Sequence, residues 1–145
     1  MQYKSTKDVR FSASHILPNL PEGHLCSRLH GHNYIVRITL GGKQLNDNGR
    51  IEDTMSVIPW ERHIQTKLDG THLNDTIPLP TPENLAAYLL NLADEYYANS
   101  GITVISVAVS QTDKCWVTAQ HEEDVAVIPE KWQYPSTPDG DHTNS

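Results

Sequence analysis

The sequence predicts an α+β fold in which two helices cover one face of a four-stranded antiparallel sheet. Three observations support this prediction: two segments of alternating apolar residues before residue 41, two stretches of helical spacing between residues 56 and 97, and two strand-like segments after them. The expected order is therefore strand, strand, helix, helix, strand, strand. Layer-packing rules place both helices on the same face of such a sheet.

Two N-terminal segments show the alternation of half-buried strands. The segment 8–15 alternates weakly and the segment 32–40 alternates clearly, before a brief extended return at Arg50–Asp53. Because successive strand side chains point to opposite faces, the two main segments each have one apolar face. These faces are formed by Val9, Phe11 and Ala13 in the first segment and by Tyr34, Val36, Ile38 and Leu40 in the second.

Helical spacing begins after these strands. Ser56 is the expected N-cap of the first helix, which places Pro59 in the first turn, where its missing N–H costs little. Thr81 is the expected N-cap of the second helix, with Pro82 at the first helical position and Gly101 beyond the end. The predicted apolar stripes are Val57, Trp60, Ile64 and Leu68 in the first helix and Leu85, Leu89, Leu92 and Tyr96 in the second.

The last third of the chain predicts two more strands. Residues 102–110 are rich in Val and Ile, and a tight turn at Asp113-Lys114 leads to a return strand over Cys115–Gln120. After this strand the periodic pattern decays. We therefore predict one domain over residues 1–121 and a partly disordered C-terminal extension over residues 122–145.

The composition argues against a nucleic-acid-binding protein, a membrane protein and a disulfide-stabilised protein. A net charge of −7 argues against nucleic acid as the main partner, because phosphate binding needs a basic face. The apolar runs are too short for a transmembrane helix, and no signal peptide is recognisable before the patterned sequence. Two cysteines do not make a disulfide framework. We therefore expect a cytoplasmic protein that contacts neither a membrane nor nucleic acid.

Residues 15–32 contain four of the eight histidines and one of the two cysteines. His30 and His32 lie two apart at the start of the second predicted strand, so they share one face about 6–7 Å apart along the chain. His15 ends the first predicted strand. Three nitrogen ligands with an open fourth position are typical of catalytic zinc, whereas structural zinc is usually closed by four ligands. Cys26, in the loop beside this site, is a candidate acid/base or nucleophile.

Five motifs resemble the 6-pyruvoyltetrahydropterin synthase family, and within it the bacterial 6-carboxytetrahydropterin synthase branch. The resemblance runs from about Val9 to Gln120, which is most of the chain. The motifs are Phe11–His15, Cys26–His32, Leu68-Asp69 with Leu73–Asp75, Pro80–Glu83 and Val109–Thr112.

The resemblance implies the tunnelling fold, in which monomers form barrels, commonly a hexamer of two stacked trimers with active sites between subunits. It implies a zinc-dependent carbon–carbon or carbon–oxygen lyase that acts on 7,8-dihydroneopterin triphosphate in the pathway to queuosine and other 7-deazaguanines. The family's zinc ligands match His15, His30 and His32. Cys26 matches its catalytic base, and an Asp–His pair completes its proton relay.

The sequence departs from the family at that relay. The family's Leu-Asp-His becomes Leu68-Asp69-Gly70, so Asp69 is present but the expected histidine is absent. His72, two residues later, either supplies the imidazole from a different backbone position or is a solvent-facing loop residue. The sequence leaves both interpretations open.

A second departure concerns the substrate ring. The family places a glutamate at the position of Gln111, where it clamps the pterin, and Thr81 is expected to help cradle the ring. Glutamine replaces one acceptor oxygen by an NH₂ donor and removes a charge. Three hypotheses follow: a lyase of the 6-carboxytetrahydropterin synthase type, a paralogue with an altered substrate, and a non-catalytic zinc- or ligand-binding homologue.

Overall fold

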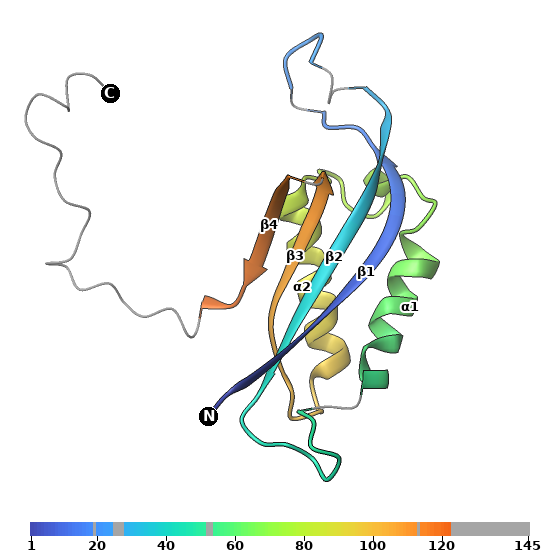
Figure 1. Cartoon of the computed structure of the whole chain (residues 1–145). Coiled ribbons are helices and arrows are strands. Elements are labelled where there is room, and N and C mark those ends of the chain that lie inside the picture. The colour runs from blue at the N-terminus through green and yellow to red at the C-terminus, as the bar shows by residue number, and fades with distance from the viewer. Residues whose placement is uncertain (19, 25–27, 52–53, 113, 123–145) are drawn as a thin grey trace, which may run out of the picture.

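The fold is a four-stranded antiparallel sheet with two helices on one face, as the sequence predicts (Figure 1). The computed structural model describes residues 1–18, 20–24, 28–51, 54–112 and 114–122. The strands lie in the order β1-β2-β3-β4 and the helices are inserted between β2 and β3 in the sequence. The elements are β1 (Tyr3–His15), β2 (His30–Gly42), η2 (Thr54–Val57), α1 (Ile58–Lys67), η3 (Leu73–Asp75), α2 (Pro82–Tyr97), β3 (Thr103–Thr112) and β4 (Cys115–Gln120).

Strands β1 and β2 are paired along their whole length. Phe11 pairs with Tyr34, Ala13 with His32 and His15 with His30, so the apolar positions of both strands fall on the same face. This face is covered by the helices. Its residues are buried from Val9 to His15 on β1 and from Tyr34 to Leu40 on β2, whereas His30 and His32 are partly buried. The pairing therefore places all three histidines at one end of the core.

The core lies between the sheet and the two helices. Trp60 on α1 is fully buried, and its indole N–H donates a hydrogen bond to the carbonyl of Leu89 on α2 at 3.1 Å. The helices are thus joined by a polar contact inside an otherwise apolar layer. The largest fully buried apolar side chains are Trp60, Tyr34, Ile38, Ile64, Leu68, Leu73, Leu85, Leu89, Val36, Val57 and Val107.

The helix ends partly differ from the prediction. α1 begins at Ile58 with Val57 as its N-cap, because residues 54–57 form the 3₁₀ turn η2. Ser56 is therefore not the cap, and its hydroxyl lies 3.0 Å from that of Tyr97. α2 begins as predicted.

Two further predictions need correction. Tyr96 is 45% exposed, and Tyr97 is buried instead because it continues the spacing of four from Leu85 and Leu89. Arg50 and Ile51 are not in a strand, and the rest of the predicted extended return lies outside the described residues. The prediction for residues 123–145 also lies outside them.

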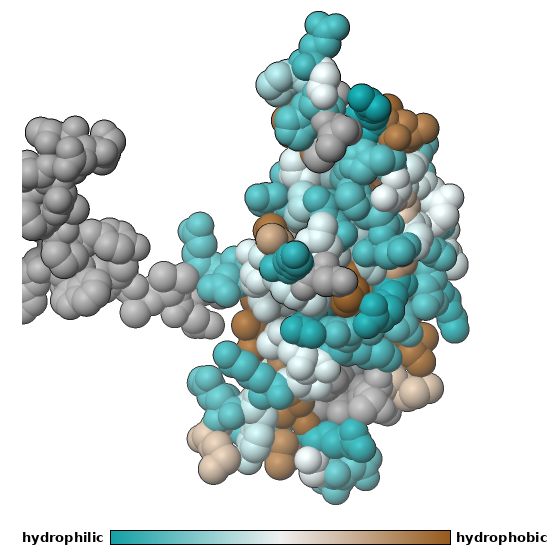
Figure 2. Space-filling model, turned by 45° about the horizontal axis from the view of Figure 1, so that its top comes forward, coloured by the Kyte–Doolittle hydropathy of each residue, from teal (hydrophilic) through white to brown (hydrophobic). Residues whose placement is uncertain are grey.

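The face of the described part that is turned to the viewer in Figure 2 is mainly hydrophilic. Figure 2 shows hydrophilic residues over most of the face in view, with small separate hydrophobic areas. None of the helices in the described ranges has the length and apolar character needed to cross a membrane.

Candidate functional site

Three histidines form a compact cluster where β1 ends and β2 begins. Their candidate ligand atoms all lie within 4.8 Å of one another. His15 is fully buried, whereas His30 and His32 are partly buried. The Nε2 atoms of His15 and His30 are 2.9 Å apart. Strand pairing thus brings together the three residues that the sequence singled out as metal ligands.

The Nδ1 atoms of His30 and His15 have hydrogen-bond partners. His30 Nδ1 lies 2.6 Å from the carbonyl oxygen of Arg28, and His15 Nδ1 lies 3.0 Å from the hydroxyl of Tyr34. The Nε2 atom of His32 is buried and has no hydrogen-bond partner among the described residues. A buried nitrogen without a partner is costly in a folded protein. A cation that accepts its lone pair would remove that cost.

The cluster favours neutral imidazoles. Burial lowers the pKa of His15 to about 4, with further lowering by the charges of His30 and His32 and a smaller opposing effect of the Pro80 carbonyl. Burial and the charge of His30 also lower the pKa of His32. Metal ions bind the neutral ring, because the lone pair must be free. The electrostatics therefore suit a divalent cation, and three imidazoles are a common donor set of catalytic zinc.

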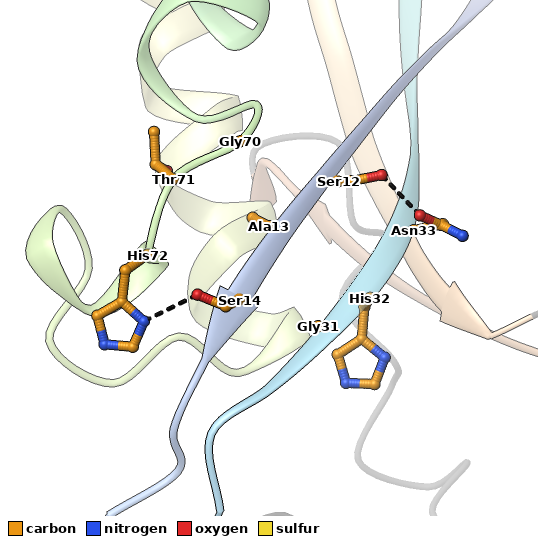
Figure 3. Close-up of a pocket in the computed structure, with 9 residues that line it drawn as sticks. All are labelled: Ser12, Ala13, Ser14, Gly31, His32, Asn33, Gly70, Thr71 and His72. Atoms are coloured by element: carbon orange, nitrogen blue, oxygen red, sulfur yellow. Dashed lines mark hydrogen bonds between the residues drawn. The ribbon is translucent and has the colours of Figure 1, made fainter.

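A pocket of about 430 Å³ lies next to His32 (Figure 3). Two hydrogen bonds cross it: Ser12 Oγ donates to Asn33 Oδ1 at 2.6 Å, and Ser14 Oγ lies 3.1 Å from His72 Nδ1. Its volume falls within the range of small-molecule sites. The pocket is lined by Ser12, Ala13, Ser14, Gly31, His32, Asn33, Gly70, Thr71 and His72.

The segment 69–72 runs beside the outer edge of β1. The N–H of Gly70 donates to the Ser12 carbonyl at 2.7 Å, and the Ser12 N–H donates to Asp69 Oδ1 at 2.8 Å. Asp69 therefore positions its segment on the strand. His72 is held at the pocket by Ser14, and no hydrogen bond among the described residues joins it to Asp69.

The backbone at Gly70 suits glycine better than the histidine that the resemblance leads us to expect there. Its φ is +73°, in the left-handed region that side chains rarely adopt. A histidine there would cost about 1–2 kcal/mol in backbone strain. The local backbone and the glycine are thus consistent with each other.

The two predicted substrate-binding residues lie at the start of α2 and near the end of β3. Thr81 is the N-cap of α2, and its hydroxyl accepts a hydrogen bond from the N–H of Asn84 at 3.1 Å. Gln111 is partly buried near the end of β3, two residues beyond Val109, which pairs with Val36. Its Oε1 atom is buried without a hydrogen-bond partner among the described residues. A buried acceptor without a partner is costly, so a donor from outside the described residues would stabilise it.

Two contributors to the site were missed by sequence reasoning. Asn74 accepts a hydrogen bond from the N–H of Ile16 at 2.9 Å and donates to the carbonyl of Ile16 at 2.8 Å, which fixes the chain after His15. Tyr34 contacts His15, and strand parity could have indicated this because Tyr34 follows His32 on the same face. The predicted base Cys26 lies outside the described residues.

Comparisons with known proteins are consistent across sequence and structure. Residues 4–122 match the family model described as 6-pyruvoyl tetrahydropterin synthase. A protein of Archaeoglobus fulgidus, provisionally named 6-carboxy-5,6,7,8-tetrahydropterin synthase, is 34% identical over 107 residues, which cover 73% of this chain and 85% of that protein. The 6-carboxy-5,6,7,8-tetrahydropterin synthase of Bacillus subtilis is 33% identical over 102 residues, covering 65% and 67% of the two chains.

Solved structures show the same fold. The 6-pyruvoyl tetrahydropterin synthase of Caenorhabditis elegans matches with a TM-score of 0.73 at 20% identity, over 83% of this chain and 96% of that chain. An uncharacterized protein of Wolinella succinogenes matches with a TM-score of 0.75 at 19% identity, over 84% and 99% of the two chains. At these identities the structural matches support the fold alone.

Proposed function

Because the chain belongs to the 6-pyruvoyl tetrahydropterin synthase family, we propose that it is a zinc-dependent 6-carboxy-5,6,7,8-tetrahydropterin synthase. Its proposed substrate is 7,8-dihydroneopterin triphosphate, in the pathway to queuosine. The names of the two relatives support this activity. The observation that carries the proposal is the cluster of His15, His30 and His32, whose candidate ligand atoms lie within 4.8 Å of one another.

The three imidazoles would hold Zn²⁺, which when bound supplies a Lewis acid for the hydroxyl oxygens of the substrate side chain. The donor set fits this ion, because His32 Nε2 is buried without another partner among the described residues. Cys26, four residues before His30 in the sequence, is the proposed base that removes a proton from the side chain.

Asp69 and His72 are the proposed proton relay. His72 lines the pocket and is held there by its contact with Ser14. An imidazole in this position can exchange a proton with a molecule in the pocket. Asp69 carries a carboxylate on the same segment, although one of its oxygens already binds the N–H of Ser12. The second oxygen is the one proposed to act in proton transfer.

Thr81 and Gln111 are the proposed contacts to the substrate ring. The buried oxygen of Gln111 offers one acceptor, and its amide nitrogen adds a donor. A ring edge with one donor and one acceptor matches this amide better than an edge with two donors. This match favours a second candidate function, in which a paralogue of the same fold acts on a related ring.

One turnover assay distinguishes these functions. Zinc-loaded protein is given 7,8-dihydroneopterin triphosphate, and the release of acetaldehyde and triphosphate is followed. We expect turnover that falls at least a hundredfold in Cys26→Ala, the usual scale of general acid–base catalysis. Cys115→Ala is the matched control, because Cys115 is an exposed free thiol on β4 and should leave turnover unchanged.

The other outcomes identify the alternatives. No turnover by the wild-type chain, with activity gained in Gln111→Glu, would support the altered-substrate paralogue. If neither chain turns over the substrate and the zinc-free and zinc-loaded forms behave alike, the result would count against both enzymatic functions and favour the non-catalytic homologue. Gly70→His is a poorer test because the left-handed φ of Gly70 strains any side chain.

We further propose a homohexamer of two stacked trimers with active sites between subunits. β1 and β4 are the edges of the sheet, and edge strands present backbone groups that another chain can pair with. Light scattering after size-exclusion chromatography should give six times the 16.3 kDa mass of one chain. The mass of a single chain would contradict this proposal.

A further inference from the structure

We propose that Tyr34 is a positioning residue that keeps the Nε2 atom of His15 directed at the metal. This inference rests on the zinc site of the proposed function and adds a residue to it. Tyr34 is 1% exposed, and its hydroxyl lies 3.0 Å from His15 Nδ1. Its ring stacks on Phe11 with ring centroids 4.8 Å apart and an interplanar angle of 12°. Stacking and burial together fix the direction of the hydroxyl.

The hydrogen bonds of the cluster determine which nitrogens carry protons. The Arg28 carbonyl can only accept, so His30 Nδ1, 2.6 Å away, must be the donor. The Nε2 atoms of His15 and His30 lie 2.9 Å apart, so both rings present this nitrogen to the centre of the cluster. On His15 the other ring nitrogen, Nδ1, is the one that lies 3.0 Å from the Tyr34 hydroxyl.

Zinc binding at the Nε2 atom of His15 needs the lone pair of that atom, which places the ring proton on Nδ1. His15 then donates from Nδ1, and the oxygen of Tyr34, 3.0 Å away, accepts. Tyr34 therefore satisfies the buried Nδ1–H and holds the ring in the orientation that metal binding needs.

Removing the Tyr34 hydroxyl should weaken zinc binding specifically. A metal-bound imidazole is a stronger N–H donor than a free one, so the lost hydrogen bond matters most in the zinc-bound state. Partners of this kind typically change metal affinity ten- to hundredfold. Tyr34→Phe keeps the ring and its stacking on Phe11, which limits the effect on folding.

The test compares Tyr34→Phe with Tyr97→Phe, which removes another buried tyrosine hydroxyl, one that lies 3.0 Å from the Ser56 hydroxyl. Zinc affinity is measured by competition with a chromophoric chelator, after urea unfolding has shown that each variant is folded. We expect affinity to fall about ten- to hundredfold in Tyr34→Phe and to change less than about twofold in Tyr97→Phe.

Nitrogen-15 NMR of the His15 ring provides a second readout. The ring proton should lie on Nδ1 after zinc is added, and its resonance should shift in Tyr34→Phe because its acceptor is lost. Wild-type zinc affinity in Tyr34→Phe, or a zinc-bound wild type without a proton on His15 Nδ1, would overturn the inference alone. If the wild-type chain binds no zinc, the proposed metal site fails and this inference fails with it.

Discussion

The zinc-free protein should lose stability between pH 7 and pH 5 because His15 resists protonation in the fold. In the unfolded chain this histidine takes up a proton near its usual pKa of 6.5, whereas burial first, and then the charges of His30 and His32, lower the folded pKa to about 4. Between these values the unfolded state binds more protons, so stability rises with pH. Acid therefore favours unfolding throughout this window.

The size of the effect follows from the two pKa values of His15. The complete gap from 6.5 to about 4 corresponds to about 3 kcal/mol. At pH 5 nearly all unfolded chains carry the proton and about a tenth of folded chains do, so the change from pH 7 to pH 5 is about 2 kcal/mol. The His32 pKa is lowered as well, which adds to the loss in the same direction.

Urea unfolding of the zinc-free protein at pH 7 and pH 5 measures this difference. Other groups also titrate, so the wild type is compared with His15→Gln, whose side chain takes up no proton. We expect the wild type to lose about 2 kcal/mol more than this variant between the two pH values. His63→Gln, on α1 outside the cluster, should behave as the wild type. Equal losses in the wild type and in His15→Gln would refute the reasoning.

Substitutions at three further positions test the segments that hold the site, each by urea unfolding at pH 7. Asn74→Ala should cost about 2 kcal/mol, because it removes two hydrogen bonds to Ile16 and leaves both of its backbone groups without them; an unchanged midpoint would contradict this. Gly70→Ala should cost about 1–2 kcal/mol through its φ of +73°, and a stabilised variant would show that the segment relaxes. Thr81→Ala should cost about 1 kcal/mol of stability, because α2 loses its N-cap hydrogen bond from the Asn84 N–H to the Thr81 hydroxyl. Thr81→Ser keeps a hydroxyl and should retain most of that stability; equal stability of the two variants would contradict a capping role.

The fold was predictable because its elements have strong periodic signals. Alternation from Tyr34 to Leu40 and the spacing of Leu85 and Leu89 correspond directly to buried faces. The first and last residues of the strands and helices were less predictable. β1 begins at Tyr3, well before its apolar alternation, because its backbone pairs with β2 as far as Gly42 whatever the side chains are.

The histidine cluster was predictable for the same reason, since strand parity alone places His30 and His32 on one face. The contacts that hold the cluster in place were not predictable. The contact between Asn74 and Ile16 joins residues 58 apart in the sequence, and no local pattern indicates it. The roles of Cys26, Asp69 and His72 remain predictions, and the turnover assay with Cys26→Ala tests the first of them.

Zinc K-edge X-ray absorption of the zinc-loaded chain tests the central claim most directly. The three-histidine site predicts nitrogen or oxygen scatterers at about 2.0–2.1 Å, with imidazole signals from His15, His30 and His32 and no sulfur scatterer. Cys26 is then free to act as the base. A sulfur scatterer at about 2.3 Å would make a cysteine a zinc ligand and would contradict the account, as would a chain that binds no zinc.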